Sequence, residues 1–225
     1  TKYIPSYCGL QFIEEINALK KITSEITKPI TCIIGGSKIS TKIKIISNLI
    51  KVFDNIIIVG GIGNAMLKNT GINIGKSVCD DDYKNLVGEI LEQSKTHNCS
   101  IYYPLDVVVS KELSGNGTIK EINEINNDEM ILDIGPKTIA SIKNIINNSN
   151  TVLWNGPAGY FENSNFANGT KEILEIISNK RSKDKIYSVA GGGETVAVIN
   201  KFNKSNSFNF VSTAGGAFLE YLEGK

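Results

Sequence analysis

The stretch TVLWNGPAGYFE, residues 151–162, carries the pattern that decides the fold, because its apolar run stops abruptly at glycine. Glycine lets the backbone approach a ligand closely, and a helix that follows offers unpaired N–H groups. The same junction recurs at residues 33–36, 58–61, 132–135, 188–193 and 212–216. In an open parallel sheet, such loops gather at the carboxyl ends of the strands, where α/β proteins bind ligands. The chain is therefore expected to hold phosphate.

The pattern around these junctions predicts a three-layer, Rossmann-like α/β fold, an open parallel sheet of about six strands with helices on both faces. The apolar runs show little alternation, which is typical of strands buried on both faces. They fall at residues 30–34, 55–59, 100–103, 130–133, 151–154, 186–189 and 208–212. Helical spacing follows at 40–52, 64–70, 80–95, 137–147, 168–178 and 195–202. Residues 106–129, with SGNG at 114–117, read as a hairpin or an irregular excursion.

Domain organisation is expected to be simple. Residues 9–26 show helical spacing with no strand before them, and a turn at 27–29 precedes the first strand. We therefore take residues 1–28 as a connector helix that packs on the domain and residues 29–225 as one α/β domain.

Composition excludes several classes of protein. The chain has 225 residues, a net charge of +1 and 41% hydrophobic residues, so neither nucleic acid nor an acidic membrane is an expected partner. No apolar run reaches the roughly 20 residues that span a bilayer. The four cysteines are far apart and contain no C-x-x-C, which favours buried or semi-buried thiols in a reducing compartment. A cytoplasmic monomer is expected.

The chain holds a single arginine, Arg181, and a single histidine, His97. Arg181 lies in a polar loop, and His97 ends a helical stretch just before a strand. Both side chains are expected to be exposed, which leaves no obvious imidazole base or guanidinium clamp for a site.

The sequence GGSK at 35–38 follows a strand and opens the expected helix that contains Lys42. Lys38 and Lys42 are spaced as neighbours on one helix face. Two cations in the first turns oppose the helix dipole and repel each other, and bound phosphate would reverse the sign of both effects. The pair therefore predicts a phosphate site.

Two other glycine patterns are weaker. The sequence GKS at 75–77 lacks the spacing and the preceding strand of a P-loop, and we reject it. The sequence GIGN at 61–64 follows a strand but has Met66 where the dinucleotide fingerprint needs glycine. Asp80–Asp82 lie near the distance expected of a ribose-binding acid, so an NAD site stays an alternative.

Two later loops are more specific. In residues 154–162, Asn155 can donate to a phosphate, Gly156 and Gly159 permit close approach, and Glu162 can accept from a ribose hydroxyl. In residues 191–195, three glycines supply a nest for anions, and Thr195 can reach a phosphate or a metal-bound water. Glu194 can approach a Mg²⁺ that phosphates carry, although a glutamate near a helix N-terminus is equally a favourable cap.

Taken together and in this order, the motifs resemble those of phosphoglycerate kinase. They are GGSK-x-x-x-K, PLDVV at 104–108, DIGPKT at 133–138, WNGPAG-x-FE, GGGET and STAGGAFLE. The likeness runs from about residue 5 to residue 225 and covers only the C-terminal, nucleotide-binding half of that enzyme. The family's N-terminal, phosphoglycerate-binding domain is not part of this sequence, and the opening helix corresponds to the family's interdomain connector.

The resemblance implies roles for individual residues. Lys38, Lys42, Gly193, Gly215 and Gly216 correspond to positions that contact the transferring phosphoryl group. The nucleotide-binding positions are Gly36, Ser37, Lys38, Lys42, Gly61, Val78, Leu132, Asn155, Gly156, Pro157, Tyr160, Glu162, Gly192, Gly193, Glu194 and Thr195. Glu194 would approach the nucleotide-bound magnesium.

Some residues depart from the family pattern. Ser37 replaces the usual alanine, Thr41 the usual aspartate, and Val59 and Ala214 two of the usual glycines. Glu194 replaces an aspartate, and its extra methylene changes the geometry toward a metal. None of these changes removes a charge at the phosphate site.

The resemblance implies reversible phosphoryl transfer between 1,3-bisphosphoglycerate and ADP, with Mg²⁺ and ADP or ATP as cofactors. The acceptor of the reverse reaction, 3-phosphoglycerate, offers a carboxylate that is already ionised at pH 7, so no general base is needed. The isolated chain is expected to bind MgADP or MgATP with little turnover, because the phosphoglycerate site would lie in the missing domain. An NAD-dependent Rossmann oxidoreductase and a non-catalytic nucleotide-binding module remain alternatives.

Overall fold

The structure is a computed structural model that describes residues 5, 7–184 and 186–224. Within them, a six-stranded sheet has the order β3-β2-β1-β7-β8-β9, and every neighbouring pair is parallel. Its strands are β1 (Ile30–Ile34), β2 (Asn55–Ile58), β3 (Ser100–Tyr102), β7 (Thr151–Asn155), β8 (Tyr187–Ala190) and β9 (Phe210–Val211). The expected three-layer parallel α/β fold is confirmed.

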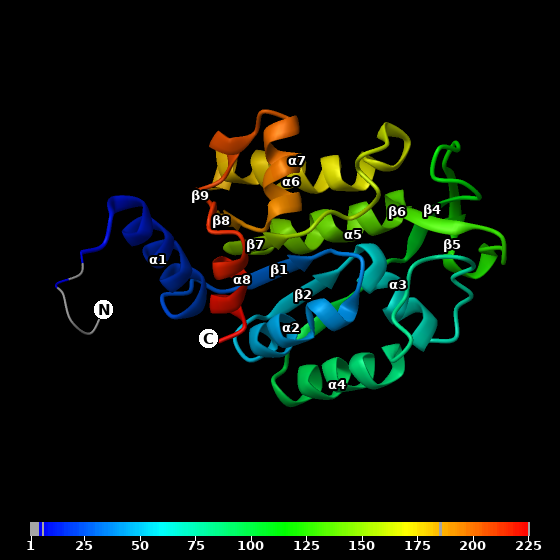
Figure 1. Cartoon of the computed structure of the whole chain (residues 1–225), viewed down its shortest axis with the longest axis horizontal. Helices are drawn as coiled ribbons and strands as arrows, with labels where there is room; N and C mark the ends of the chain where they lie inside the picture. The colour runs from blue at the N-terminus through cyan, green and yellow to red at the C-terminus, as the bar shows by residue number, and fades with distance from the viewer. Residues whose placement is uncertain (1–4, 6, 185, 225) are drawn as a thin grey trace.

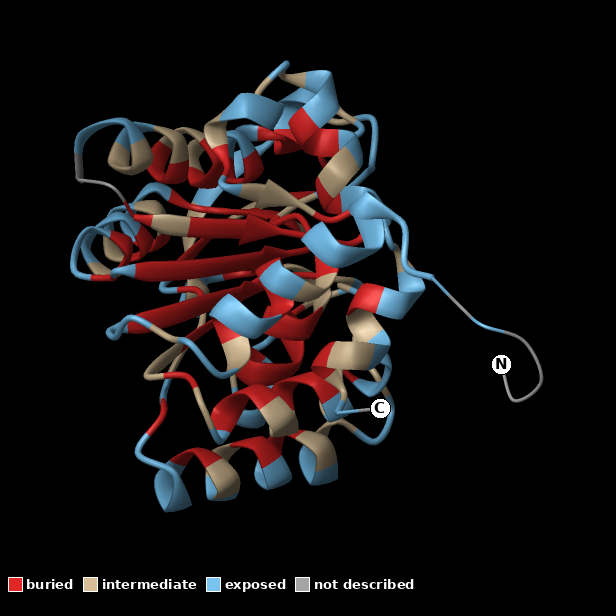
Figure 2. Cartoon of the chain, turned by 90° about the vertical axis from the view of Figure 1, so that its left-hand side faces the viewer, coloured by how far each residue is buried: buried red, intermediate tan, exposed pale blue. Residues whose placement is uncertain are grey.

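Helices cover both faces of this sheet (Figure 1). One layer contains α2 (Ile43–Ile50), α3 (Gly60–Asn69), α4 (Tyr83–Thr96) and α8 (Gly216–Leu222). The other contains α5 (Pro136–Asn147), α6 (Asn168–Asp184) and α7 (Gly193–Lys201). The central strand β1 is buried along its whole length, with Cys32 and Ile34 in one core cluster and Ile33 in the other. Figure 2 shows the strands of the sheet buried between helices whose outer faces are exposed.

A second, three-stranded antiparallel sheet lies at one end of the molecule (Figure 1). Its order is β5 (Thr118–Glu121), β4 (Asp106–Ser110) and β6 (Met130–Ile134). The expected hairpin around residues 114–117 is confirmed, since it joins β4 to β5. The expectation that residues 130–133 belong to the parallel sheet is wrong, because β6 pairs antiparallel with β4. A buried apolar run fits either sheet, so periodicity alone could not distinguish them.

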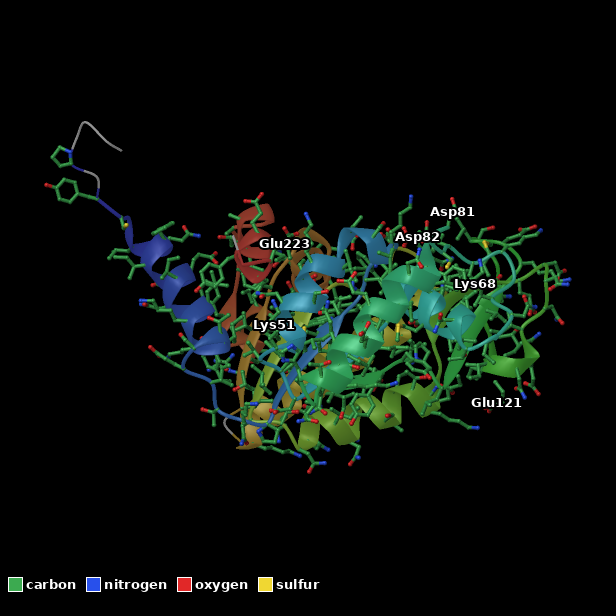
Figure 3. All side chains as sticks on the ribbon, turned by 90° about the horizontal axis from the view of Figure 1, so that it is seen from below. Lys51, Lys68, Asp81, Asp82, Glu121 and Glu223 are labelled. Carbon is green, nitrogen blue, oxygen red and sulfur yellow. The ribbon has the colours of Figure 1, made fainter. Side chains whose placement is uncertain are left out.

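The opening helix α1 (Leu10–Thr23) packs on the domain through Leu19 and Ile22, which join the same core cluster as α2. Of the expected 1–28 segment, residues 1–4 and Ser6 lie outside the described residues. Four short 3₁₀ turns complete the described elements, at Ile39–Thr41, Ile122–Glu124, Ser164–Phe166 and Ser205–Ser207. Charged side chains such as those of Lys51, Asp81 and Glu121 project from the surface (Figure 3). None of the helices in the described residues is long and apolar enough to cross a membrane.

Candidate functional site

The order of the strands places a topological switch point between β1 and β7. The chain builds outward from β1 to β3, then returns to β7 and builds outward on the other side to β9. Open α/β sheets bind ligands at the carboxyl ends of the strands near such a switch point. The loops of Gly35 and Gly156 follow these two strands. Both belong to the glycine junctions identified in the sequence.

The two loops cross so closely that glycine is required. The amide of Gly35 donates to the carbonyl oxygen of Asn155 over 2.8 Å. A Cβ added at Gly35 would lie 2.0 Å from the carbonyl oxygen of Pro157, and one added at Gly156 would lie 2.3 Å from the carbonyl oxygen of Gly35. Gly156 also has a φ of 96°, in the left-handed region. These glycines serve the close packing of the two loops.

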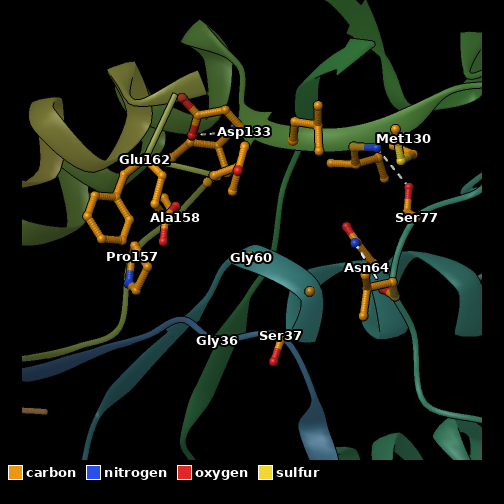
Figure 4. Close-up of a pocket in the computed structure, with 18 of the residues that line it drawn as sticks. Gly36, Ser37, Gly60, Asn64, Ser77, Met130, Asp133, Pro157, Ala158 and Glu162 are labelled. Carbon is orange, nitrogen blue, oxygen red and sulfur yellow. Dashed lines mark hydrogen bonds between the residues drawn. The ribbon is translucent and has the colours of Figure 1, made fainter. Parts of the chain in front are cut away.

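A cavity of about 300 Å³ opens beside this crossing, between the main sheet and the second sheet (Figure 4). One wall is apolar, with Val78, Pro104, Met130, Ile131 and Leu132. The rest of the lining combines glycine backbone and further apolar side chains with polar ones, among them Glu162 and Glu194. A cavity with an apolar slot at one side and polar groups at the other suits a ligand that has a flat base and a charged tail.

Lys42 lies at the edge of this cavity. Its Nζ donates to Oδ1 of Asn155 over 2.5 Å, and a Cβ built at Gly36 would lie 3.7 Å from its Cε. Asn155 is buried, and its Nδ2 donates to the carbonyl oxygen of Gly191 over 2.6 Å. The amide therefore links the ammonium to the glycine loop, so Asn155 orients Lys42. A direct contact between Asn155 and phosphate stays a prediction.

The half-buried position of Lys42 affects the pKa of its ammonium. Loss of hydration lowers the pKa of its ammonium, and the nearby carboxylate of Glu194 opposes this shift. An ammonium that gives up water for a neutral amide gains from the arrival of an anion. The electrostatics of Lys42 thus favour a bound phosphate.

The loop Gly191–Thr195 joins the same site from β8. Gly192 adopts a φ of 95°, and α7 begins at the next residue. The hydroxyl of Thr195 accepts from the amide of Gly156 over 2.6 Å, and this side chain is buried. Thr195 therefore holds two of the predicted loops together.

The structure gathers most of the predicted residues. Nine line the cavity, namely Gly36, Ser37, Gly61, Val78, Leu132, Pro157, Tyr160, Glu162 and Glu194. Lys42, Asn155, Gly156, Gly192 and Thr195 lie beside it through the contacts described above. Gly193 is exposed at the start of α7, immediately before Glu194.

Lys38, Gly215 and Gly216 are not among the residues that line the cavity. Lys38 has extended backbone and an exposed side chain, and a 3₁₀ turn separates it from α2. The expectation that Lys38 and Lys42 share one α-helical face is therefore wrong. Gly215 and Gly216 begin α8, which Asn48 of α2 contacts through a 2.8 Å bond to the carbonyl oxygen of Leu222.

The GKS segment, rejected as a P-loop, and Asp80 of the NAD alternative both have structural roles. Ser77 accepts from the amide of Ile131 over 2.8 Å, and Gly75 forms an isolated bridge with Met130, so this segment extends the second sheet. Asp80 accepts from the amide of Ile39 over 2.7 Å and from the hydroxyl of Ser40 over 2.6 Å. This carboxylate holds the turn before α2, and its hydrogen bonds do not support the ribose-binding role of the NAD alternative.

The side chain of His97 is exposed, as expected, but Arg181 is half-buried and bonds the carbonyl oxygen of Asn206. The four cysteines are free thiols, and Cys32, Cys79 and Cys99 are buried or half-buried as expected. The same expectation is wrong for Cys8, which is exposed.

Sequence reasoning missed two polar residues in the cavity wall, Asn64 and Asp133. Asp133 is buried and accepts from the amides of Gly169, at 2.7 Å, and Ile134, at 2.9 Å. Burial raises its pKa to about 7, against the effect of these amides. The signal available in the sequence was a polar residue inside an apolar run, as in MILDI at 130–134 and GIGNAML at 61–67.

Fold and cavity define an α/β domain with a cavity beside the switch point of a parallel sheet. Over residues 1–225 the sequence matches the family model for phosphoglycerate kinase, so the chain belongs to the phosphoglycerate kinase family. The phosphoglycerate kinase of Francisella philomiragia is 44% identical over 227 residues, covering 100% of this chain and 57% of that protein. The enzyme of Xanthobacter autotrophicus is 40% identical over 224 residues, covering 99% and 57%.

Solved structures agree with this assignment. The phosphoglycerate kinase of Coxiella burnetii superposes with a TM-score of 0.90 at 40% identity, covering 95% of this chain and 55% of that one. The enzyme of Pyrococcus horikoshii gives a TM-score of 0.77 at 25% identity, covering 95% and 54%. The resemblance read from the motifs is confirmed. The chain spans a little over half the length of the relatives it matches.

Proposed function

We propose that this chain is the nucleotide-binding half of a phosphoglycerate kinase, which transfers a phosphoryl group reversibly between 1,3-bisphosphoglycerate and ADP, giving 3-phosphoglycerate and ATP. The observation that carries the proposal is the position of Lys42, half-buried at the cavity edge and bonded to the neutral amide of Asn155. The apolar wall of the same cavity suits a nucleotide base, and Glu162 at its rim suits the ribose hydroxyls.

The proposed chemistry needs alignment and charge stabilisation. A carboxylate acceptor is already ionised at neutral pH, so this reaction does not require a protein base. Lys42 would hold the phosphate oxygens, oriented by Asn155, and the first turn of α7 would present backbone N–H groups to them. Gly193, Gly215, Gly216 and Lys38 remain proposed contacts of the transferring group.

The residues present fit a magnesium ion that arrives with the nucleotide. The described residues contain no group of three or more His, Cys, Asp or Glu side chains that could hold a metal by themselves. Mg²⁺ commonly takes one or two carboxylates together with substrate phosphates, and Glu194 offers one carboxylate at the cavity. When bound, the ion would neutralise charge on the phosphate oxygens.

The phosphoglycerate site is proposed to lie outside this chain, in the part of the relatives that it does not cover. We take residues 1–28 as the connector to that part and residues 29–225 as the nucleotide-binding domain. A cytoplasmic monomer without nucleic-acid or membrane partners completes the proposal.

Calorimetric titration with MgADP and a coupled kinase assay on the same preparation test this function. We expect saturable, 1:1 binding of MgADP and negligible turnover. Tight binding of NAD without preference for ADP would instead support the oxidoreductase alternative. Robust turnover by these 225 residues alone would contradict the proposed location of the phosphoglycerate site.

A further inference from the structure

The side chain of Asn64 carries a hydrogen-bond acceptor that has no partner among the residues that the structure describes. Asn64 lies in the second turn of α3, is 3% exposed and lines the cavity. Its Nδ2 donates to the carbonyl oxygen of Val78 over 3.1 Å, whereas its Oδ1 has no hydrogen-bond partner in the described part of the chain. Buried side-chain oxygens are rarely left unpaired in folded proteins, so this one calls for an explanation.

The contact with Val78 fixes which end of the amide faces the cavity. The carbonyl oxygen of Val78 can only accept, so the amide nitrogen of Asn64 must point toward it. The amide oxygen is then left on the side opposite the bond to Val78, and Figure 4 shows the side chain of Asn64 at the wall of the cavity. A ligand that meets Asn64 must therefore present a donor.

The surroundings of Asn64 indicate which part of the ligand that donor belongs to. Four apolar residues line the cavity near Asn64. Val78 bonds Asn64 through its carbonyl oxygen, Pro104 packs against the preceding residue, Gly63, and Met130 and Ile131 of β6 line the same cavity. Lys42 and Glu194 lie toward the glycine loops instead, near the N-terminus of α7. The phosphates of a nucleotide would bind near Lys42 and the start of α7. The flat base would then lie against the apolar residues near Asn64.

We infer that Asn64 determines base specificity: its Oδ1 accepts a hydrogen bond from the exocyclic 6-amino group of adenine. The inference rests on the proposed function, since it names the base which the same cavity holds. Among purines, an amino group at position 6 offers a donor where a 6-oxo group offers an acceptor. An oxo group facing Oδ1 would leave both oxygens unpaired, and buried unpaired groups weaken binding.

The direct test compares ADP with purine riboside 5′-diphosphate, which is ADP without the 6-amino group. We expect the unmodified chain to bind MgADP about tenfold more tightly than the magnesium complex of this analogue. Asn64→Leu should weaken ADP binding by about the same factor and leave analogue binding nearly unchanged, so that the ratio falls to about one. Asn69→Leu, the same substitution at an exposed position of the same helix, should leave the ratio intact.

Other outcomes overturn the inference. Equal affinity of the unmodified chain for ADP and the analogue would exclude a contact with the amino group, even while binding of both upheld the nucleotide site. An equal loss of affinity for both ligands in Asn64→Leu would mean that Asn64 only shapes the wall. The affinity ratio of the unmodified chain decides the question without any variant if Asn64→Leu fails to fold, and Asn64→Ala then provides a smaller substitution.

Discussion

At the scale of single residues, the charge of Lys42 is the feature most directly tied to phosphate binding. We predict that Lys42→Met weakens MgADP binding by about 10- to 100-fold, because a charge-assisted contact is lost. Titration calorimetry measures the change. Lys44→Met, two residues later in α2 and exposed, serves as the matched control and should change the affinity little. Equal effects of the two substitutions would mean that Lys42 contributes only general charge.

Asp133 gives the protein a pH-dependent stability. Burial raises its folded-state pKa to about 7, from an ordinary value of 3.8. The folded protein therefore retains a proton that the unfolded chain releases between these values. The contribution of Asp133 to the free energy of unfolding is therefore complete at low pH, and it is lost as the pH rises through about 7.

We predict that Asp133→Asn, which cannot ionise, removes this component. Between about pH 5 and about pH 8, the free energy of unfolding of the unmodified chain should fall relative to that of the variant. Urea unfolding across this range measures both. Parallel pH profiles would show that Asp133 stays ionised throughout, held by the amides of Gly169 and Ile134.

The sequence predicted individual residues best where their chemistry is local. Glycine junctions marked the crossing of Gly35 with Gly156, and the motif order located Lys42, Asn155 and Glu194. The geometry of the Lys38 side chain was not predictable, because a 3₁₀ turn rather than an α-helix follows it. Asn64 and Asp133 were missed because their importance depends on burial, which tertiary packing creates.

At the scale of elements, one buried carboxylate fastens α1 to the last glycine loop. Glu15 accepts from the hydroxyl of Ser212 over 2.8 Å and from the amide of Thr213 over 2.9 Å. We predict that Glu15→Ala destabilises the protein by about 2 kcal/mol, since it leaves these donors without their charged partner. The melting temperature should fall by about 4–8 °C. Glu14→Ala, on the exposed side of α1, should leave it unchanged within about 1 °C.

Hydrogen exchange tests whether that loss is local. In Glu15→Ala, the amides of α1 and of residues 212–214 should exchange faster through local opening. The amides of β1 and β7 should still exchange only as fast as global unfolding allows. Uniform acceleration would show that α1 unfolds only together with the core.

Helices and strands were predictable from the sequence where the spacing of apolar residues fits only one kind of structure. The six strands of the main sheet emerged from their apolar runs, and β6 did not, because its neighbours β4 and β5 lie in the segment read as irregular. Helix α3 begins at Gly60, four residues before the expected start. Glycine is a poor helix former, yet a Cβ at Gly61 would lie 2.2 Å from the carbonyl oxygen of Ser37. Close packing, which the sequence does not display, overrides propensity here.

At the scale of the whole molecule, the strand order explains why glycine junctions that are far apart in the sequence meet near one cavity, which four of the six line. Five of the six follow strands of the parallel sheet, and the two that flank the switch point touch. The sixth, at residues 132–135, follows β6 and closes the cavity from the second sheet. Ligand binding should therefore join elements from both sheets, and the stability of the whole domain should respond to it.

We predict that MgADP at about 100 times its dissociation constant stabilises the chain by about 2.7 kcal/mol. For a domain of this size, the melting temperature should rise by about 5–10 °C. Adenosine, which shares the base and lacks the phosphates, should at equal concentration produce a much smaller rise, because Lys42 and the start of α7 have no anion to hold. Differential scanning calorimetry measures both shifts. Equal shifts would assign the binding energy to the base alone, and would contradict a site in which the switch-point loops bind phosphate.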